Sequence, residues 1–432
     1  MPDSMSTFPR IAITGSGAVC GAGLNPGAIL DAIVEGRSAV APIAYWNAEN
    51  WPIRMAAQIT GVKDQVLVDD RKLHKSISRT DLFGIYAGDE AIKSSGLRAY
   101  REAMAEGDVP QFNDRSGLVV GSGGGSYQVN YDFFPLMTTS AGDMVKFGQE
   151  LASSVHPMWL LRILPNNVLC HVGIRNNFKG TNACITNQCA SGALAIVEAA
   201  ASLRTGEADR IVAIGHDAPI EPETILGYHN LGLLSSDAVR SFDRRRTGTI
   251  FGEGAAALAL EPLETAQARN ATIFGEYLGS GSVSEATGVV QLTPDGDGVA
   301  RAMKLALAEA GISPGEVGMI VAHGNGTPNS DASEAAAILR VFGTDVPPVT
   351  GFKWAIGHTL AAAGTLDTVL ALEALRRGVV PGIPTLTEVD PAFAALPVSI
   401  ATRPPRTDIA LIMCRGFGGM NVAILVRKGN AS

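Results

Sequence analysis

The sequence lacks several features that would indicate particular classes of protein. It has no uninterrupted apolar run of membrane-spanning length and no signal peptide. Its five cysteines, at positions 20, 170, 184, 189 and 414, are an odd number without the spacing of a metal site. A net charge of −8 argues against a general nucleic-acid binder. We therefore expect a soluble protein of the reducing cytoplasm, with no membrane span, metal or nucleic-acid partner.

Charged residues are also few, at 18% of the chain, whereas hydrophobic residues make up 46%. This composition is typical of a well-packed globular protein and excludes a disordered chain. The length of 432 residues exceeds that of a usual single core. Two domains or two fused halves are therefore expected.

Residues 186–194 (TNQCASGAL) join a short apolar segment to a helix that should run to about Leu203. Glu198 is the only charged residue between Ala190 and Leu203, and a helix that is apolar nearly all round belongs in a core. The first turn of a helix has N–H groups without intrahelical partners and a dipole that favours negative charge. We therefore expect Cys189 to be stabilised as a thiolate and to act as a nucleophile. A small structural side chain, the commoner role of a free cysteine, is the alternative.

A weak internal repeat relates the two halves of the chain. Residues 192–206 and 364–378 both begin and end with glycine, and their leucines and one arginine occupy matching positions. Strand-to-glycine turns at 116–125 and 318–327 also correspond. The repeat favours a duplicated α/β unit over two unrelated domains.

We place the two halves at residues 1–265 and 266–432. The first half should carry the cysteine and an irregular region at about 126–180, interpreted as an inserted cap or interface layer. The second half should carry the polar residues that a cysteine nucleophile needs.

Those polar residues lie at predicted strand ends beside glycine. His323 follows the apolar residues 319–322, Lys353 and His358 come just before the repeated helix, and residues 415–421 follow the last core strand. Each histidine alone is better explained as a satisfied core residue. Several such features at equivalent strand ends indicate one shared site, and the glycines would bring backbone N–H groups close to a ligand.

Two weaker signals also have simple structural explanations. Arg71, Lys72 and Lys75 cluster in an otherwise acidic chain, and they form either a solvated face or a dock for an acidic partner. Gly15 and Gly17 form a strand-to-helix turn, but no third glycine and no acid for a ribose follow at the expected spacing. Dinucleotide binding is therefore only a distant alternative.

Taken together, the ordered Cys, His, Lys and His resemble those of the β-ketoacyl-[acyl-carrier-protein] synthases of the elongating, decarboxylating type, in the thiolase superfamily. The resemblance covers residues 11–421 and is carried by 179–192, 242–254, 323–328, 353–358 and 416–421. It implies a thiolase fold, in which two duplicated α/β halves form a five-layered αβαβα core, and a homodimer.

The resemblance also implies a reaction. Cys189 would accept an acyl group as a thioester, and malonyl-acyl carrier protein would lose CO2 and condense with it to give 3-oxoacyl-carrier protein. His323 and His358, as neutral imidazoles, would stabilise the malonyl enolate, and Lys353 would set their electrostatics. The reaction would serve fatty-acid synthesis or specialised long-chain or polyketide synthesis. It would need no metal or redox cofactor, because the substrates are carried on the phosphopantetheine of the acyl carrier protein.

Further roles follow from the same resemblance. The backbone N–H groups of Cys189 and Phe417 would form an oxyanion hole, and the Phe417 side chain would gate the second substrate. Glu334 would support Lys353 and the histidines, while Asn325 and Thr327 would contact pantetheine. Arg71, Lys72 and Lys75 would dock the acyl carrier protein.

The sequence departs from the family pattern at Asn187, Gln188, Asn325, Arg415 and residues 354–356. These departures favour a specialised synthase over a housekeeping one. Two rival functions remain open at this point. One is a catalytically silent partner subunit such as a chain-length factor, although such partners typically lack the cysteine. The other is a thiolase-type acyltransferase, for which Cys414 would be the second cysteine.

Overall fold

The computed structural model describes residues 8–124 and 134–429. Its main sheet has ten strands in the order β10-β9-β11-β12-β8-β1-β7-β6-β4-β5. In chain order these are β1 (Ile11–Cys20), β4 (Ser116–Ser122), β5 (Asn182–Ile185), β6 (Arg210–Asp217), β7 (Gly254–Pro262), β8 (Gly275–Ser284), β9 (Met319–Val321), β10 (Val349–Thr350), β11 (Ile409–Gly416) and β12 (Met420–Lys428). A separate two-stranded sheet pairs β2 (Val40–Pro42) with β3 (Met55–Ala57).

The strand order repeats outward from the centre of the sheet. The first half reads β1-β7-β6-β4-β5 and the second reads β8-β12-β11-β9-β10. In each half, two antiparallel pairs are followed by two parallel pairs. The two units join where residues 11–13 of β1 pair antiparallel with residues 275–277 of β8. The predicted duplication of an α/β unit is therefore seen in the topology.

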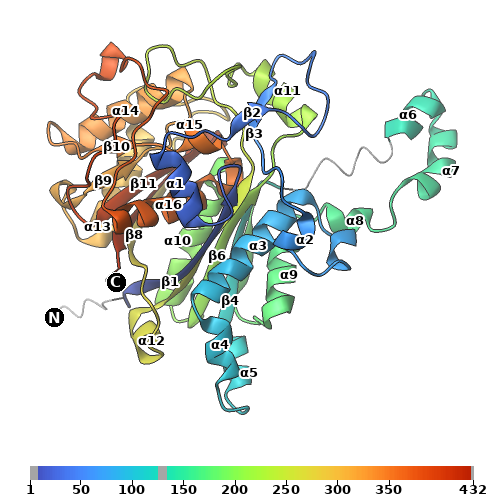
Figure 1. Cartoon of the computed structure of the whole chain (residues 1–432), viewed down its shortest axis with the longest axis horizontal. Coiled ribbons are helices and arrows are strands. Elements are labelled where there is room, and N and C mark those ends of the chain that lie inside the picture. Colours follow the sequence, from blue (N-terminus) through green and yellow to red (C-terminus); the bar gives the residue numbers. More distant parts are fainter. Residues whose placement is uncertain (1–7, 125–133, 430–432) are drawn as a thin grey trace.

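Helices cover both units and fill the space between them (Figure 1). Between the two units lie α10 (Ser191–Arg204) and α16 (Ala363–Arg377), which pack on β6 and on β11 and against each other. The first outer layer holds α3 (Arg79–Ser94) and α9 (Asn167–Asn176), and the opposite outer layer holds α13 (Asp297–Ala310) and α14 (Pro328–Phe342). These layers confirm the predicted αβαβα architecture.

The buried central helices approach each other closely because glycines stand at the contact. A Cβ atom on Gly192 would lie 2.6 Å from the carbonyl oxygen of Ala361, and one on Gly364 would lie 2.6 Å from the Cβ of Ala193. Twelve of the fifteen residues of α16 are buried, which explains its apolar sequence. The glycines of the internal repeat are thus packing residues.

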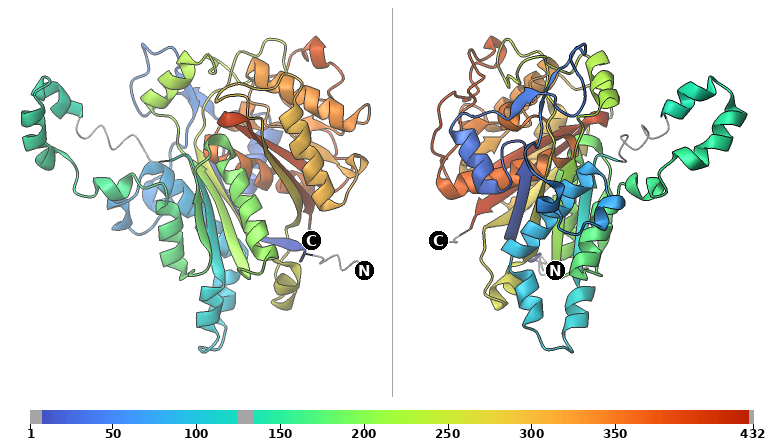
Figure 2. Two further views of the ribbon diagram at one scale, coloured as in Figure 1. Left: turned by 180° about the vertical axis from the view of Figure 1, so that it is seen from behind. Right: turned by 45° about the vertical axis from the view of Figure 1, so that its right-hand side comes forward.

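The region predicted as an inserted cap divides into two parts. Residues 126–133 lie outside the described residues. The short helices α6 (Phe134–Ser140) and α7 (Met144–Ser154) extend away from the body, and α8 (Trp159–Arg162) leads back to it (Figure 2). By contrast, α9 packs on α3 through fully buried Val168 and Val172, so it belongs to the outer helical layer.

The remaining helices are shorter or peripheral. They are α1 (Pro26–Val34), α2 (Asp64–Leu67), α4 (Leu97–Glu102), α5 (Val109–Asp114), α11 (Pro222–Asn230), α12 (Leu263–Ala268) and α15 (Lys353–Ile356). Within residues 8–124 and 134–429, each helix is too short or too polar to cross a membrane.

Candidate active site

Cys189 lies in a short 3-10 helix, η3 (Gln188–Ala190), which leads directly into α10. Its side chain is buried, with 5% of its surface exposed. The turn is held by the hydroxyl of Ser191, which accepts a hydrogen bond from the Asn187 N–H at 2.7 Å and donates one to the Gln188 carbonyl at 2.8 Å. The structure therefore presents the thiol on a fixed turn at the start of a buried helix.

The end of β11 lies against this turn. The Cys414 thiol donates a hydrogen bond to the Cys189 carbonyl oxygen at 3.1 Å. A Cβ atom on Gly416 would lie 3.3 Å from the backbone nitrogen of Ala190. The glycine loop that carries Phe417 therefore begins beside the cysteine, as the resemblance implies.

A narrow cavity of about 70 Å³ brings the predicted residues of both halves together. Its lining includes Cys189, Tyr228, His323, Asn325, Thr327, His358, Arg415 and Phe417. Lys353 and Glu334 do not line this cavity, because both are buried behind it.

His323 follows β9 in a turn that is fixed by Glu334 of α14. The carboxylate of Glu334 accepts hydrogen bonds from the N–H groups of His323 at 2.7 Å and of Gly324 at 2.9 Å. The Nδ1 atom of His323 lies 3.4 Å from the backbone N–H of Arg415, which donates to it. That bond assigns the imidazole proton to Nε2. Glu334 thus supports His323 through the backbone.

The His323 and His358 rings lie edge to face, with centroids 5.1 Å apart. Burial lowers the pKa of both imidazoles well below the usual value, and the charge of Lys353 lowers both pKa values further. Both histidines are therefore neutral at physiological pH. The backbone N–H of His358 donates to the Ile250 carbonyl at 2.7 Å, which anchors the second histidine to the first half.

Lys353 forms a buried ion pair with Asp367, in which Nζ lies 2.9 Å from Oδ2. Burial opposes the lysine charge, but the adjacent Asp367 carboxylate raises the pKa of Lys353 above its usual value. Asp367 was not predicted as a residue of the site. Its signal was an acid within the otherwise apolar start of α16, a position that requires a charged partner.

The predicted thiolate at Cys189 is wrong for this structure. Burial first, and then the charge of Asp217, raise the pKa of Cys189 to about 12. The loss of water therefore outweighs the favourable helix terminus. The resting form is the thiol, and its proton must leave for the sulfur to act as a nucleophile.

Asn325 and Thr327 are bonded to each other at the edge of the cavity. The Oδ1 atom of Asn325 accepts hydrogen bonds from the Thr327 hydroxyl at 2.8 Å and from the Thr327 N–H at 3.0 Å. The Oδ1 atom of Asn325 is thus occupied within this pair, which fixes the two side chains relative to each other.

The Phe417 ring stacks on Tyr228, with ring centroids 5.2 Å apart. Tyr228 also packs edge to face on Phe251, at 4.8 Å. These aromatic contacts close the cavity on the side of α11. Tyr228 was not predicted as a site residue, because a lone aromatic in a largely exposed helix carries no recognisable pattern.

Arg415 is buried in a polar network that the sequence analysis also missed. Its guanidinium donates to Glu285 at 3.0 Å, to Asn421 at 2.9 Å and to the Ser330 carbonyl at 2.9 Å. Asn421 donates in turn to Glu285 at 3.0 Å. This network ties the end of β11 to α14 and to the end of β8. Arg415 is therefore a buried cation whose guanidinium is hydrogen-bonded within the protein.

Arg71, Lys72 and Lys75 are exposed just before α3 and do not line the cavity. Among the described residues, no group of three or more histidine, cysteine, aspartate or glutamate side chains could hold a metal ion.

Comparison with known proteins identifies the family. A model described as "Beta-ketoacyl synthase, N-terminal domain" matches residues 9–266, and "Beta-ketoacyl synthase, C-terminal domain" matches residues 274–387. The chain belongs to the beta-ketoacyl synthase family. The chain is 31% identical over 431 residues to 3-oxoacyl-[acyl-carrier-protein] synthase 2 of Coxiella burnetii, covering 97% of this chain and 98% of that relative. It is 28% identical to Nodulation protein E of Rhizobium meliloti, covering 97% of this chain and 99% of that relative.

Solved beta-ketoacyl synthase structures share the fold. One from Burkholderia phymatum superimposes with a TM-score of 0.85 at 29% identity and covers 97% of this chain and 99% of the other. The ishigamide ketosynthase/chain length factor gives a TM-score of 0.84 at 26% identity and covers 98% of this chain and 100% of the other. The thiolase-type alternative is not favoured, and Cys414 points its thiol at a backbone carbonyl instead of lining the cavity.

Proposed function

We propose that this beta-ketoacyl synthase is a 3-oxoacyl-[acyl-carrier-protein] synthase. It condenses an acyl group held on Cys189 with malonyl-acyl carrier protein and releases CO2 and free carrier protein. One observation carries the proposal: Cys189, His323 and His358, which come from both halves of the chain, line a single narrow cavity.

The first step is acyl transfer. The Cys189 sulfur attacks the thioester carbonyl of the acyl-carrier protein, the bond to the pantetheine sulfur breaks, and the thiol proton ends on the released carrier. The N–H groups of Cys189 and Phe417 hold the oxyanion, and one such donor contributes about 3 kcal/mol. Since burial raises the pKa of the thiol, proton loss accompanies attack and a free thiolate does not accumulate.

The second step is decarboxylation. The bond between the malonyl carboxylate carbon and the α-carbon breaks, CO2 leaves, and the electron pair forms an enolate. Neutral His323 and His358 donate hydrogen bonds to the enolate oxygen as its charge develops. Lys353 supports this role because its positive charge helps to keep both rings neutral.

The third step is condensation. The α-carbon of the enolate attacks the acyl carbonyl on Cys189, and the tetrahedral intermediate collapses with loss of the cysteine sulfur. The sulfur takes up one proton from the solvent, and 3-oxoacyl-carrier protein leaves. No step requires a metal or redox cofactor.

The remaining predicted residues serve substrate binding in this proposal. Asn325 and Thr327 contact the pantetheine arm at the edge of the cavity, and Phe417 separates the two substrates. The exposed residues Arg71, Lys72 and Lys75 dock the acidic carrier protein, because surface charges of opposite sign steer association.

We also propose a homodimer acting in the reducing cytoplasm. The supporting feature is β5, which forms one edge of the sheet and offers unpaired backbone groups to a second copy. All five cysteines are free, as a reducing compartment requires.

Intact-mass analysis after incubation with acyl-carrier protein tests the proposal. The expected adduct has the mass of the acyl group, is lost in Cys189→Ala and persists in Cys414→Ala. Malonyl-carrier protein should then release CO2 in proportion to product. A chain that forms no adduct is a silent partner subunit, and thioester exchange with acyl-CoA without CO2 release indicates a thiolase-type enzyme.

A further inference from the structure

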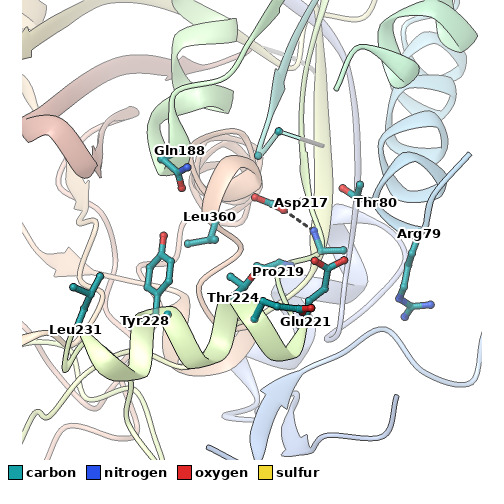
Figure 3. A pocket seen from close by; sticks show the side chains of 15 residues that line it. Arg79, Thr80, Gln188, Asp217, Pro219, Glu221, Thr224, Tyr228, Leu231 and Leu360 are labelled. Carbon is teal, nitrogen blue, oxygen red and sulfur yellow. Dashed lines mark hydrogen bonds between the residues drawn. The ribbon is translucent and has the colours of Figure 1, made fainter. Parts of the chain in front are cut away.

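A second and larger cavity, of about 470 Å³, adjoins the site (Figure 3). Tyr228 lines both cavities, and Gln188, the neighbour of the proposed nucleophile, lines the larger one. Leu360 contributes from the second half of the chain. An acyl chain attached to Cys189 therefore has this volume beside it, and the narrow cavity of about 70 Å³ is too small for a long chain.

The lining of the larger cavity is acidic. Asp217, Glu221 and Glu223 line it, and Arg79 is the one basic residue among the described residues of the lining. Figure 3 shows Asp217 at the end of β6 and Glu221 just before α11 beside the cavity, and Glu223 lies in the first turn of α11. The formal charge of the lining is thus negative, which is unlike a tunnel for an alkyl chain.

Asp217 is built into this wall. Its carboxylate accepts hydrogen bonds from the Ala218 N–H at 2.8 Å and from the Ala361 N–H at 3.2 Å. A Cβ atom on Gly123 would lie 2.2 Å from Oδ2 of Asp217, so only glycine leaves room for the carboxylate. Burial raises the pKa of Asp217 to about 6, which leaves it mostly ionised at neutral pH.

Arg79 does not cancel the acidic character of the cavity. Its guanidinium donates to the buried carboxylate of Glu253 through Nε at 3.0 Å and to the Ile59 carbonyl at 2.7 Å, and it lies 4.0 Å from the ring centroid of Tyr45. The hydroxyl of Thr80, which also lines the cavity, is bonded to His216 at 2.9 Å. Both side chains therefore have protein partners.

The Tyr228 hydroxyl is an independent sign that a polar ligand belongs here. The oxygen is buried and has no hydrogen-bond partner among the described residues. Figure 3 shows the side chain rising from α11 toward the cavity. An unpaired buried hydroxyl is destabilising because it has lost its bonds to water, and a hydrogen-bonding ligand would remove that cost.

We infer that this cavity receives the acyl chain of the Cys189 thioester and selects chains that carry a hydrogen-bond donor, a hydroxyl or a protonated amine, over plain alkyl chains. The inference rests on the proposed function and names its substrate class. An alkyl chain would cover Asp217 and the Tyr228 hydroxyl without bonding to them. A site built for a polar group rejects an analogue that lacks it far more strongly than an apolar pocket rejects a hydroxyl.

The test compares three N-acetylcysteamine thioesters of one chain length, hexanoyl, 6-hydroxyhexanoyl and 6-aminohexanoyl, on the full-length protein. Intact mass gives the rate of Cys189 acylation by each. We expect the hydroxyl or amino chain to react at least about tenfold faster than hexanoyl, the effect of one good hydrogen bond. Preference for the amine alone assigns the cationic class, and preference for both assigns neutral donors as well.

Two variants locate the selectivity. Glu223→Gln should reduce the ratio of amino to hexanoyl rates, and Tyr228→Phe should reduce the ratio of hydroxyl to hexanoyl rates. Glu207→Gln, an exposed glutamate after α10, should leave both ratios as in the wild type. Equal rates for the three thioesters, or preference for hexanoyl, overturn the inference while leaving the proposed function intact. If no thioester acylates Cys189, acyl-carrier protein is tested next, and failure there overturns the proposed function itself.

Discussion

Gln188 and Leu360 occupy equivalent positions in the two halves, and both have a positive φ, of 45° and 41°. Each is the first residue of a short 3-10 helix that leads into a buried central helix, and each lines the larger, acidic cavity. Positive φ is costly for residues other than glycine, so its repetition shows that both turns need this geometry. In the first half the turn presents Cys189, and in the second it presents Ala361, whose N–H binds Asp217.

The close approach of the central helices predicts that Gly364→Ala is destabilising. The new Cβ would lie 2.6 Å from the Cβ of Ala193 and 2.8 Å from its backbone nitrogen, so the helices must separate. We expect a loss of about 1–3 kcal/mol in the free energy of unfolding, measured by urea denaturation. Gly148→Ala in α7 is the matched control, because nothing lies within 4 Å of its new Cβ. Equal stability of the two variants would contradict the packing role.

The sequence predicted the duplicated architecture because the repeat has a physical cause. Gly192 and Gly364 are required wherever the two central helices touch, so the pattern survives in both halves. Apolar strands that open into glycine turns also revealed where His323 and Phe417 would lie. These features are local in sequence, and the resemblance to a known family joined them into one site.

Long-range polar partners could not be predicted in the same way. Glu285 pairs with Arg415 across 130 residues, through a contact that no local pattern encodes. The acid at Asp367 indicated a charged partner but did not identify it as Lys353. The protonation state of Cys189 was also mispredicted, since it depends on burial and on Asp217 from another strand. The acidic cavity was not predicted, because Asp217 and Glu221 resemble ordinary surface acids in the sequence and only the fold brings them beside Glu223.

The low histidine pKa values predict the pH dependence of decarboxylation. Neutral imidazoles are needed, and both pKa values lie well below 6.5, so the rate should be retained as the pH falls through 6.5. The measurement is CO2 release from malonyl-carrier protein across pH. In the double variant Lys353→Met/Asp367→Asn, the nearby cation is lost without leaving a bare carboxylate. The acid limb of its pH–rate profile should move upward by about one pH unit, because the charge of Lys353 no longer lowers the histidine pKa values. An acid limb at pH 6.5 in the wild type would contradict the proposed neutral pair.

The Arg415 network predicts strong coupling between its members. Removal of one partner of a buried ion pair leaves an uncompensated charge and typically costs about 3–5 kcal/mol. We expect Arg415→Met to lose stability on this scale in urea denaturation. The double variant Arg415→Met/Glu285→Gln should recover part of that loss, because the remaining side chain is neutral. Additive losses in the double-mutant cycle would show that the ion pair contributes no coupling.

Asp217 predicts a shift in the reactivity of the proposed nucleophile. Its carboxylate is the second cause, after burial, that raises the pKa of Cys189 to about 12. Asp217→Asn should therefore lower the pKa of the thiol by about one unit, while burial keeps it above that of a free cysteine. The measurement is the rate of iodoacetamide alkylation against pH, with Cys189 followed by peptide mass.

Asp209→Asn is the matched control, because Asp209 directly precedes the same strand, β6, at the end remote from Cys189. It is partly exposed and pairs with Arg115, so its loss should leave the alkylation profile unchanged. Raised reactivity in Asp217→Asn alone would show that a wall residue of the acidic cavity also holds the nucleophile in its thiol form. Identical profiles in both variants and the wild type would mean that burial alone sets the pKa of Cys189, and that the cavity acts on substrate selection without tuning the sulfur.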